Sequence, residues 1–237
     1  KDGAFVLQIN GQAVQARRPC YWDPSRSVPG PDGKDVHAVE TFDIALAPRL
    51  HCLTHMTAFS KGECCPTAGP DCQIVETPRR LRGWVGIQRY LHEEEYGLDI
   101  VRNGRVIEPQ NKELFVWTGG DRPEREYPID DPRNRGRFIG EIHLDHCRVH
   151  YTKDHFERDD PSWSEMLELI RGPGPLRPEK GRSLGFGPSE APLYRLYQVF
   201  RRSSPHGKTG RWTRILSVKN NERAIEMADL FLKGEAE

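Results

Sequence analysis

The stretch RFIGEIHLDHCRVHYTKDHFERDD, residues 137–160, decides the fold of this chain. In its first half, apolar or small residues alternate with polar ones from Phe138 to Val149, which predicts a β-strand. Gly140 within it marks either a bulge or a place where two strands pack closely. Asp160 is a good helix N-cap and is followed by a proline, which suits a first helical turn. The stretch therefore predicts a strand, a turn and a helix in succession.

The turn between that strand and that helix carries a lysine, Lys153. A lysine at the tip of a strand-to-helix junction can present a compact positive charge to a group outside the domain. A solvated surface lysine without a partner is the alternative, and spacing alone does not separate the two.

The composition predicts a folded chain whose net charge creates no strong electrostatic field. The chain has 237 residues, enough for one large domain or two small ones, and a mean hydropathy of −0.72. Its 35 basic and 35 acidic residues cancel, so net charge does not draw it toward nucleic acid. We find no apolar run of about 20 residues, as a membrane span needs, and no signal peptide. The chain starts at Lys1 rather than Met, so we expect processing or a piece of a longer protein.

The cysteines predict a metal site in HCLTHMTAFSKGECCPTAGPDC, residues 51–72. Four of the six cysteines of the chain fall in this stretch, which favours a metal cluster in a cytoplasmic protein over disulfides. Two pairs of nitrogen or sulfur ligands would give Zn²⁺ a closed tetrahedron with a structural role. The best set of ligands is Cys52, His55, Cys65 and Cys72, with Cys64 or His51 as substitutes. Free thiols, or a degenerate site that holds no metal, are the alternative.

Strands and hairpins are predicted elsewhere in the first two thirds of the chain. Asn-Gly pairs at 10–11 and 103–104 lie between apolar segments and predict tight hairpins. Val36 to Ala47 reads as a strand that Pro48 ends, and Arg79 to Leu91 reads as another. Leu193 to Arg202 has an apolar stripe at helical spacing and predicts a helix.

Two stretches resemble one family. GWVGIQRYLHEEEYGLDIVRNGRVI, residues 83–107, and GEIHLDHCRVHYTKDHF, residues 140–156, are similar to the second domain of MORC-type ATPases, in particular the prokaryotic MORC-like proteins. These belong to the GHKL group, with gyrase B, MutL and the heat-shock chaperones. The resemblance is strong over residues 83–156, extends more weakly over about 5–202, and fades after 203.

The resemblance implies a role for Lys153. In GHKL proteins an Asn/Thr-Lys-x-x-Phe turn of the transducer domain carries a lysine that reaches the γ-phosphate of ATP, and Thr152, Lys153 and Phe156 match that turn. ATP and Mg²⁺ would be held by an N-terminal ATPase domain, whose asparagine-bearing helix, catalytic glutamate and glycine-rich lid have no counterpart here. The chain would therefore be no enzyme on its own. Homodimerisation, and the handling of DNA or defence against foreign DNA, are implied as outputs.

The family also implies the architecture. We expect an α+β fold of the transducer type, with a split β-α-β arrangement, a mixed and mainly antiparallel sheet, and helices on one face. Residues 1–49 and 74–202 would form the transducer domain, residues 50–73 a zinc-ribbon-like insertion, and residues 203–237 a C-terminal helical extension. MORC-like bacterial proteins often carry such a ribbon, but here the first pair is C-x-x-H and six residues, not two, separate Cys65 from Cys72.

A freestanding zinc-containing nucleic-acid-binding module is the rival hypothesis. It would use the ribbon together with arginines at 79, 80 and 82, and with five further arginines as contacts to nucleic acid or a partner: Arg102, Arg105, Arg133, Arg135 and Arg137. The basic run 133–137 would lie on a loop that leads into the central strand. Surface charges without a ligand are the alternative for all of them.

Overall fold

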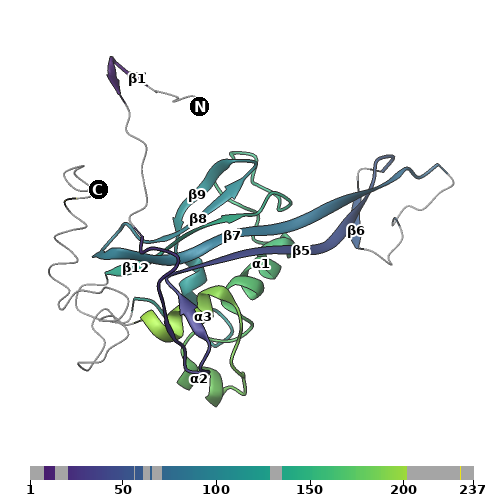
Figure 1. The fold of residues 1–237 in the computed structure, drawn as a ribbon. Helices are drawn as coiled ribbons and strands as arrows, with labels where there is room; N and C mark the ends of the chain where they lie inside the picture. Colours follow the sequence, from purple (N-terminus) through teal and green to yellow (C-terminus); the bar gives the residue numbers. More distant parts are fainter. Residues whose placement is uncertain are drawn as a thin grey trace, which may run out of the picture.

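The computed structural model describes residues 8–13, 21–55, 57–60, 65, 71–128, 135–201 and 230. Its main sheet has six strands in the order β6-β5-β7-β12-β8-β9 (Figure 1). These strands are β5 (Val39–Cys52), β6 (Thr57–Ser60), β7 (Ile74–His92), β8 (Gly97–Arg102), β9 (Arg105–Asn111) and β12 (Gly136–His143). Shorter antiparallel pairs are β1 (Gln8–Ile9) with β2 (Gln12–Ala13), β3 (Ser27–Pro29) with β4 (Asp35–His37), and β10 (Val116–Trp117) with β11 (Glu124–Arg125).

The helices follow the last strand of the sheet and pack on one of its faces (Figure 1). They are α1 (Pro161–Arg171), α2 (Pro178–Ser183) and α3 (Pro192–Phe200), and a single 3-10 turn, η1 (Glu113–Phe115), precedes β10. The apolar sides of α1 and α3 meet the buried residues of β7, β8 and β12 in one core. No helix in the described part of the chain is long and apolar enough to cross a membrane.

The predicted α+β class is confirmed, with a mixed, mainly antiparallel sheet. Only β12 and β8 pair in parallel, and the other neighbours in the sheet are antiparallel. The connection between β8 and β12 runs through β9, η1, β10 and β11. Across the described residues no α-helix links two strands of this sheet, so the split β-α-β connection that the resemblance implies is not seen there.

Close strand packing, not a bulge, explains Gly140 in β12. A Cβ at Gly140 would overlap the backbone oxygen of Trp84, and one at Gly83 of β7 would overlap that of Glu141. Glycine at both positions therefore lets the central strands β7 and β12 approach each other. The strand itself is shorter than predicted, because the chain turns after His143, where the N–H of Cys147 donates to the oxygen of Leu144 (3.3 Å).

The prediction that Pro48 ends a strand is wrong. The structure has β4, a break at Ala38, and then β5, which continues through Pro48 to Cys52. The register between β5 and β7 shifts between Leu46 and Arg49, so Pro48 lies at an irregularity where the ladder needs no N–H donor. The extension of β5 carries the chain outward to the predicted metal site.

Both Asn-Gly hairpins are present. Asn103 and Gly104 have φ of 50° and 77°, and Asn10 and Gly11 have 51° and 76°, as a type I′ turn requires. The first hairpin is described for residues 8–13 only. The C-terminal extension predicted for 203–237 lies outside the described residues except for Leu230.

A buried ion pair fixes the C-terminal end of α1. Arg171 donates to Glu126 (Nη2 to Oε2, 2.6 Å), and Glu126, fully buried, also accepts the backbone N–H groups of Leu176 (3.0 Å) and Arg177 (3.2 Å). Removing one partner of such a pair leaves an uncompensated buried charge. We expect Glu126→Ala to lower the free energy of unfolding by about 3–5 kcal/mol, measured by urea denaturation.

The matched control for that prediction is Glu124→Ala on the neighbouring strand β11. Glu124 pairs with Lys180 and Arg177 at a partly exposed position, so its loss should cost about 1 kcal/mol or less. An equal decrease in the free energy of unfolding for the two variants would show that burial of the Arg171–Glu126 pair adds nothing to stability.

Asp160 caps α1 and links it to the sheet. It accepts the N–H groups of Ser162 (2.9 Å) and Arg148 (3.0 Å) and a hydrogen bond from Arg49 of β5 (3.2 Å). Burial by itself would raise the pKa of Asp160, but these hydrogen bonds outweigh it and hold the pKa well below its ordinary value.

This lowered pKa predicts a loss of stability in acid. The contribution of ionised Asp160 is complete above the ordinary Asp pKa of about 3.9 and is lost as the pH falls from there through the folded pKa. We therefore expect wild type to be more stable than Asp160→Asn at neutral pH, and the difference to shrink below about pH 4. Urea denaturation across this range tests it, and a difference that does not change with pH contradicts it.

Candidate functional site

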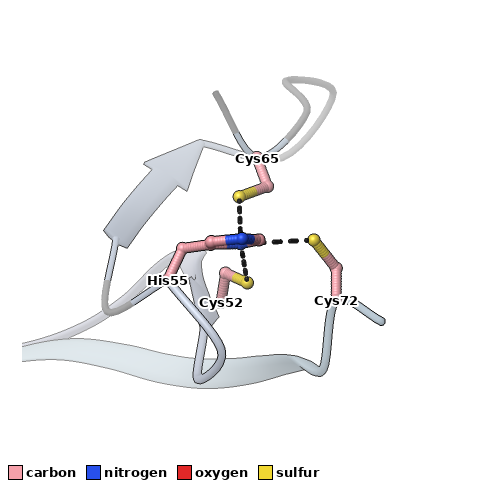
Figure 2. Close-up of side chains that lie close together, drawn as sticks. All are labelled: Cys52, His55, Cys65 and Cys72. Atoms are coloured by element: carbon pink, nitrogen blue, oxygen red, sulfur yellow. Dashed lines mark hydrogen bonds between the residues drawn. The ribbon is translucent and has the colours of Figure 1, made fainter. Parts of the chain in front are cut away.

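Four side chains meet at the far end of the long ribbon that β5 and β7 form (Figures 1 and 2). Cys52 is the last residue of β5, His55 lies in the turn to β6, Cys65 follows β6, and Cys72 lies two residues before the start of β7. The His55 Nδ1 atom lies 3.4 Å from the Cys52 sulfur and 3.5 Å from the sulfurs of Cys65 and Cys72. We call these four residues the Cys/His cluster.

The spacing in the Cys/His cluster is that of a tetrahedral metal site. Zn–S bonds of about 2.3 Å and Zn–N bonds of about 2.0–2.1 Å, set at the tetrahedral angle, place sulfur and nitrogen about 3.5–3.6 Å apart. The three observed distances from nitrogen to sulfur, 3.4 to 3.5 Å, agree with that edge. All four ligand atoms lie within 4.8 Å of one another, so the cluster could hold a metal ion.

The state of the thiols fits a ligand role. Cys52, Cys65 and Cys72 form no disulfide. Burial opposes ionisation of Cys52, but hydrogen bonds from the backbone and the ring of His55 outweigh it, so the pKa of this thiol is lowered. The hydrogen bonds to Cys52 and Cys65 raise the pKa of His55. The thiolate is the species that binds a metal, so a lowered thiol pKa favours binding.

Among the residues that the structure describes, few others hold this end of the ribbon. Cys52, Phe59 and Cys65 form a small buried group apart from the main core, and of the described residues Leu50 and Cys72 pack against it. The neighbouring Ile74 and Val75 are 52% and 44% exposed. A bound metal would therefore replace the hydrophobic core that this segment lacks. Of the two substitutes, His51 does not join the cluster and Cys64 lies outside the described residues.

Lys153 lies at the tip of a turn, residues 150–155, which we call the lysine turn. Its φ of 59° is left-handed, and its N–H donates to the oxygen of His150 (2.8 Å). The N–H of His150 donates in turn to the oxygen of His155 (3.0 Å), and Val149 bridges to Phe156. The Lys153 side chain is exposed, and within the described part of the chain its ammonium has no ion-pair partner.

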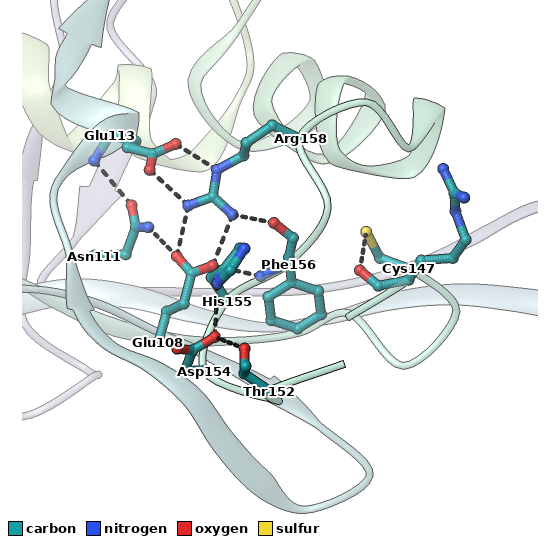
Figure 3. A network of polar contacts seen from close by, with 10 residues as sticks. Glu108, Asn111, Glu113, Cys147, Thr152, Asp154, His155, Phe156 and Arg158 are labelled. Atoms are coloured by element: carbon teal, nitrogen blue, oxygen red, sulfur yellow. Dashed lines mark hydrogen bonds and ion pairs between the residues drawn. The ribbon is translucent and has the colours of Figure 1, made fainter. Parts of the chain in front are cut away.

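A buried carboxylate anchors the base of the lysine turn (Figure 3). Glu108 of β9 accepts the N–H of Phe156 (2.7 Å) and both terminal nitrogens of Arg158 (2.7 and 2.8 Å). Burial alone would raise the pKa of Glu108, but the hydrogen bonds from Arg158 and Phe156 outweigh it and lower the pKa. The ring of Phe156 is fully buried and stacks on Trp163 of α1 (5.9 Å between centroids). The turn is therefore fixed at its base while its tip is free.

The predicted contact arginines are not gathered into one exposed patch. Arg135 pairs with Glu93 (3.2 Å), and Arg102 donates to the backbone oxygen of Asp145 (3.3 Å). Arg105 is exposed at the start of β9, and Arg133 lies outside the described residues. The prediction that Arg137 lies on a loop is wrong, because Arg137 belongs to β12 and is 1% exposed.

The arginines of β7 are also engaged. Arg79 pairs with Glu165 of α1, Arg80 with Asp43, and Arg82 with Asp145 (3.8 Å). Their positive charge is thus balanced locally, which leaves less of it to attract a phosphate backbone.

Comparison with known proteins gives no relative. No family model, no curated protein and no solved structure matches the chain. Its function is therefore argued from the two features above, the Cys/His cluster and the lysine turn.

Proposed function

We propose that this chain is the transducer region of a MORC-like GHKL ATPase, in which Lys153 contacts the γ-phosphate of ATP held by another domain. The observation that carries the proposal is the presentation of Lys153: its ammonium is exposed and unpaired within the described chain, on a turn whose base is fixed by Glu108. A turn held in this way keeps the backbone of Lys153 in place, so on contact only the side chain has to be ordered.

The chemistry of the contact supports a sensor. An ammonium on a flexible stem attracts the charge of a terminal phosphate. The triphosphate offers that group and the diphosphate does not, so one orientation of the transducer is stabilised only before hydrolysis. The chain contributes no ATP-binding motif of its own and does not turn over ATP alone. Dimerisation and the handling of DNA are the outputs that the resemblance adds to this proposal.

Within the same proposal, the ion in the Cys/His cluster is Zn²⁺. Three sulfurs and one nitrogen at tetrahedral spacing suit Zn²⁺ better than Mg²⁺ or Ca²⁺, which take oxygen ligands. Four protein ligands leave no open position, so the ion is structural and holds the end of the ribbon together. Thiols kept free for a metal also favour the cytoplasm.

The rival, a nucleic-acid-binding module, is the weaker proposal because the β7 arginines are paired and Arg137 is buried. A gel shift of the isolated chain at increasing salt separates the two hypotheses. Tight, salt-dependent binding without nucleotide would favour the module, and weak binding would favour the transducer.

Amide hydrogen exchange in the protein that contains both the ATP-binding domain and this region tests the transducer role. We expect the amides of residues 150–157 to exchange more slowly with a non-hydrolysable ATP analogue than with ADP, because only the triphosphate engages Lys153. Exchange that is the same with both nucleotides would overturn the proposal.

A further inference from the structure

The lysine turn brings together three further side chains that bind metals, His150, Asp154 and His155. One ligand atom from each lies within 4.8 Å of the others, and none belongs to the Cys/His cluster. The imidazole rings of His150 and His155 stack with centroids 4.4 Å apart and planes 20° apart. Asp154 lies 2.6 Å from His155 (Oδ1 to Nδ1). Figure 3 draws this contact beside the Glu108 network.

The backbone explains why these groups converge. His150 and His155 face each other across the hairpin, since the N–H of His150 donates to the oxygen of His155 (3.0 Å) and Val149 bridges to Phe156 just below them. The base of the same hairpin is held by Glu108. The three ligands are therefore ordered before any ion binds, which lowers the entropy lost on binding.

The surrounding hydrogen bonds orient the ligands but do not satisfy them fully. His150 Nδ1 lies 2.8 Å from the Thr152 hydroxyl, and Thr152 in turn donates to Asp154. Each imidazole still has a second nitrogen, and Asp154 a second carboxylate oxygen, for which the structure gives no partner among the residues it describes. A metal ion with hydrogen-bonded outer groups is the usual arrangement for histidine ligands.

We infer that His150, Asp154 and His155 form a second metal site, which binds a divalent transition-metal ion such as Zn²⁺. Two imidazoles and one carboxylate favour Zn²⁺, Co²⁺, Ni²⁺ or Cu²⁺ over Mg²⁺ and Ca²⁺. With three protein ligands, at least one coordination position stays open, in contrast to the closed Cys/His cluster. Because the site is exposed and Lys153 is part of the same turn, that position can accept water or an oxyanion such as phosphate. The inference stands on the turn alone and does not depend on the proposed ATPase.

Metal binding by the full chain tests the inference, with any affinity tag removed. After equilibrium dialysis against micromolar Zn²⁺, we expect wild type to hold one ion more than His155→Ala and one more than Asp154→Asn. Cys72→Ser should lose the other ion and keep this one. With Co²⁺, the ion retained by Cys72→Ser should lack the intense absorption that thiolate ligands give, because its ligands are nitrogen and oxygen.

His37→Ala removes an exposed histidine outside the turn and is the matched control, expected to bind as wild type does. Asp154→Asn keeps the shape of the side chain, and slow exchange of the Phe156 amide, which donates to Glu108, checks that the turn is intact in each variant. We expect at least a tenfold loss of Zn²⁺ affinity in Asp154→Asn. The same metal content in wild type, His155→Ala and Asp154→Asn would overturn the inference.

Discussion

Replacing Lys153 with alanine is expected to lower the ATP turnover of the protein that contains this region by about 10²–10³-fold, as removal of one donor to a charged transition state does. The lysine would stabilise charge that develops on the terminal phosphate, and it is the only lysine or arginine in residues 150–155. Its side chain is exposed, and within the described chain it has no ion-pair partner, so the substitution should leave the fold unchanged. Steady-state phosphate release, with circular dichroism as the check on folding, measures the effect.

Two variants make this prediction specific. Lys34→Ala removes an exposed lysine, paired with Glu190, that lies outside the lysine turn, and it should turn over ATP at the wild-type rate. Lys153→Arg keeps the charge but replaces the compact ammonium with a larger, planar group, so an intermediate rate is expected. Lys153→Ala with wild-type turnover and an intact fold would return Lys153 to the role of a surface lysine.

Replacing Cys52 with serine is expected to remove the ion from the Cys/His cluster and open the end of the ribbon. Zn²⁺ binds zinc-finger peptides with an apparent free energy of about 10–16 kcal/mol, and folding of such small segments depends on it. Among the described residues, the buried group around the cluster is small, so we expect it to hold β6 against β5 only weakly without the ion. We expect fast amide exchange in 50–60 and no change in the main core.

Metal content per chain and amide exchange together test this expectation. Cys147→Ala is the control, because Cys147 is a free cysteine buried in the main core, away from the Cys/His cluster. This variant should keep the ion. A structural zinc site would be contradicted if the purified wild-type protein contained no metal. It would also be contradicted if Cys52→Ser left the rate of amide exchange in β6 unchanged.

Local signals predicted much of this fold correctly. The Asn-Gly hairpin at 103–104 and the cap of α1 at Asp160 each depend on a few neighbouring residues, and both are present. The four ligands of the Cys/His cluster could also be selected from the sequence, because cysteine and histidine have few uses in a short loop rich in glycine and proline. These predictions needed no knowledge of the rest of the chain.

The features that sequence analysis missed depend on contacts between distant residues. Arg137 reads as part of a basic loop, yet it lies buried in β12, at the point where the pairing of β12 with β7 shifts register. Glu108 lies 50 positions before Arg158, and no local pattern links the two. The passage of β5 through Pro48 depends on an irregularity in its pairing with β7. Each is set by which strands become neighbours.

Covalent labelling with a reactive derivative of ATP tests whether Lys153 lies beside the terminal phosphate. An acyl-phosphate derivative of ATP carries an acyl group on its terminal phosphate; an amine close to that phosphate attacks the carbonyl carbon, forms an amide and releases ATP. In the intact protein with its ATP-binding domain, we predict that mass spectrometry finds this amide on Lys153 and that excess ATP suppresses it, while Lys34 is labelled slowly and without protection. A contact between Lys153 and the γ-phosphate would be contradicted if Lys153 and Lys34 were labelled equally. It would also be contradicted if excess ATP did not suppress the labelling of Lys153.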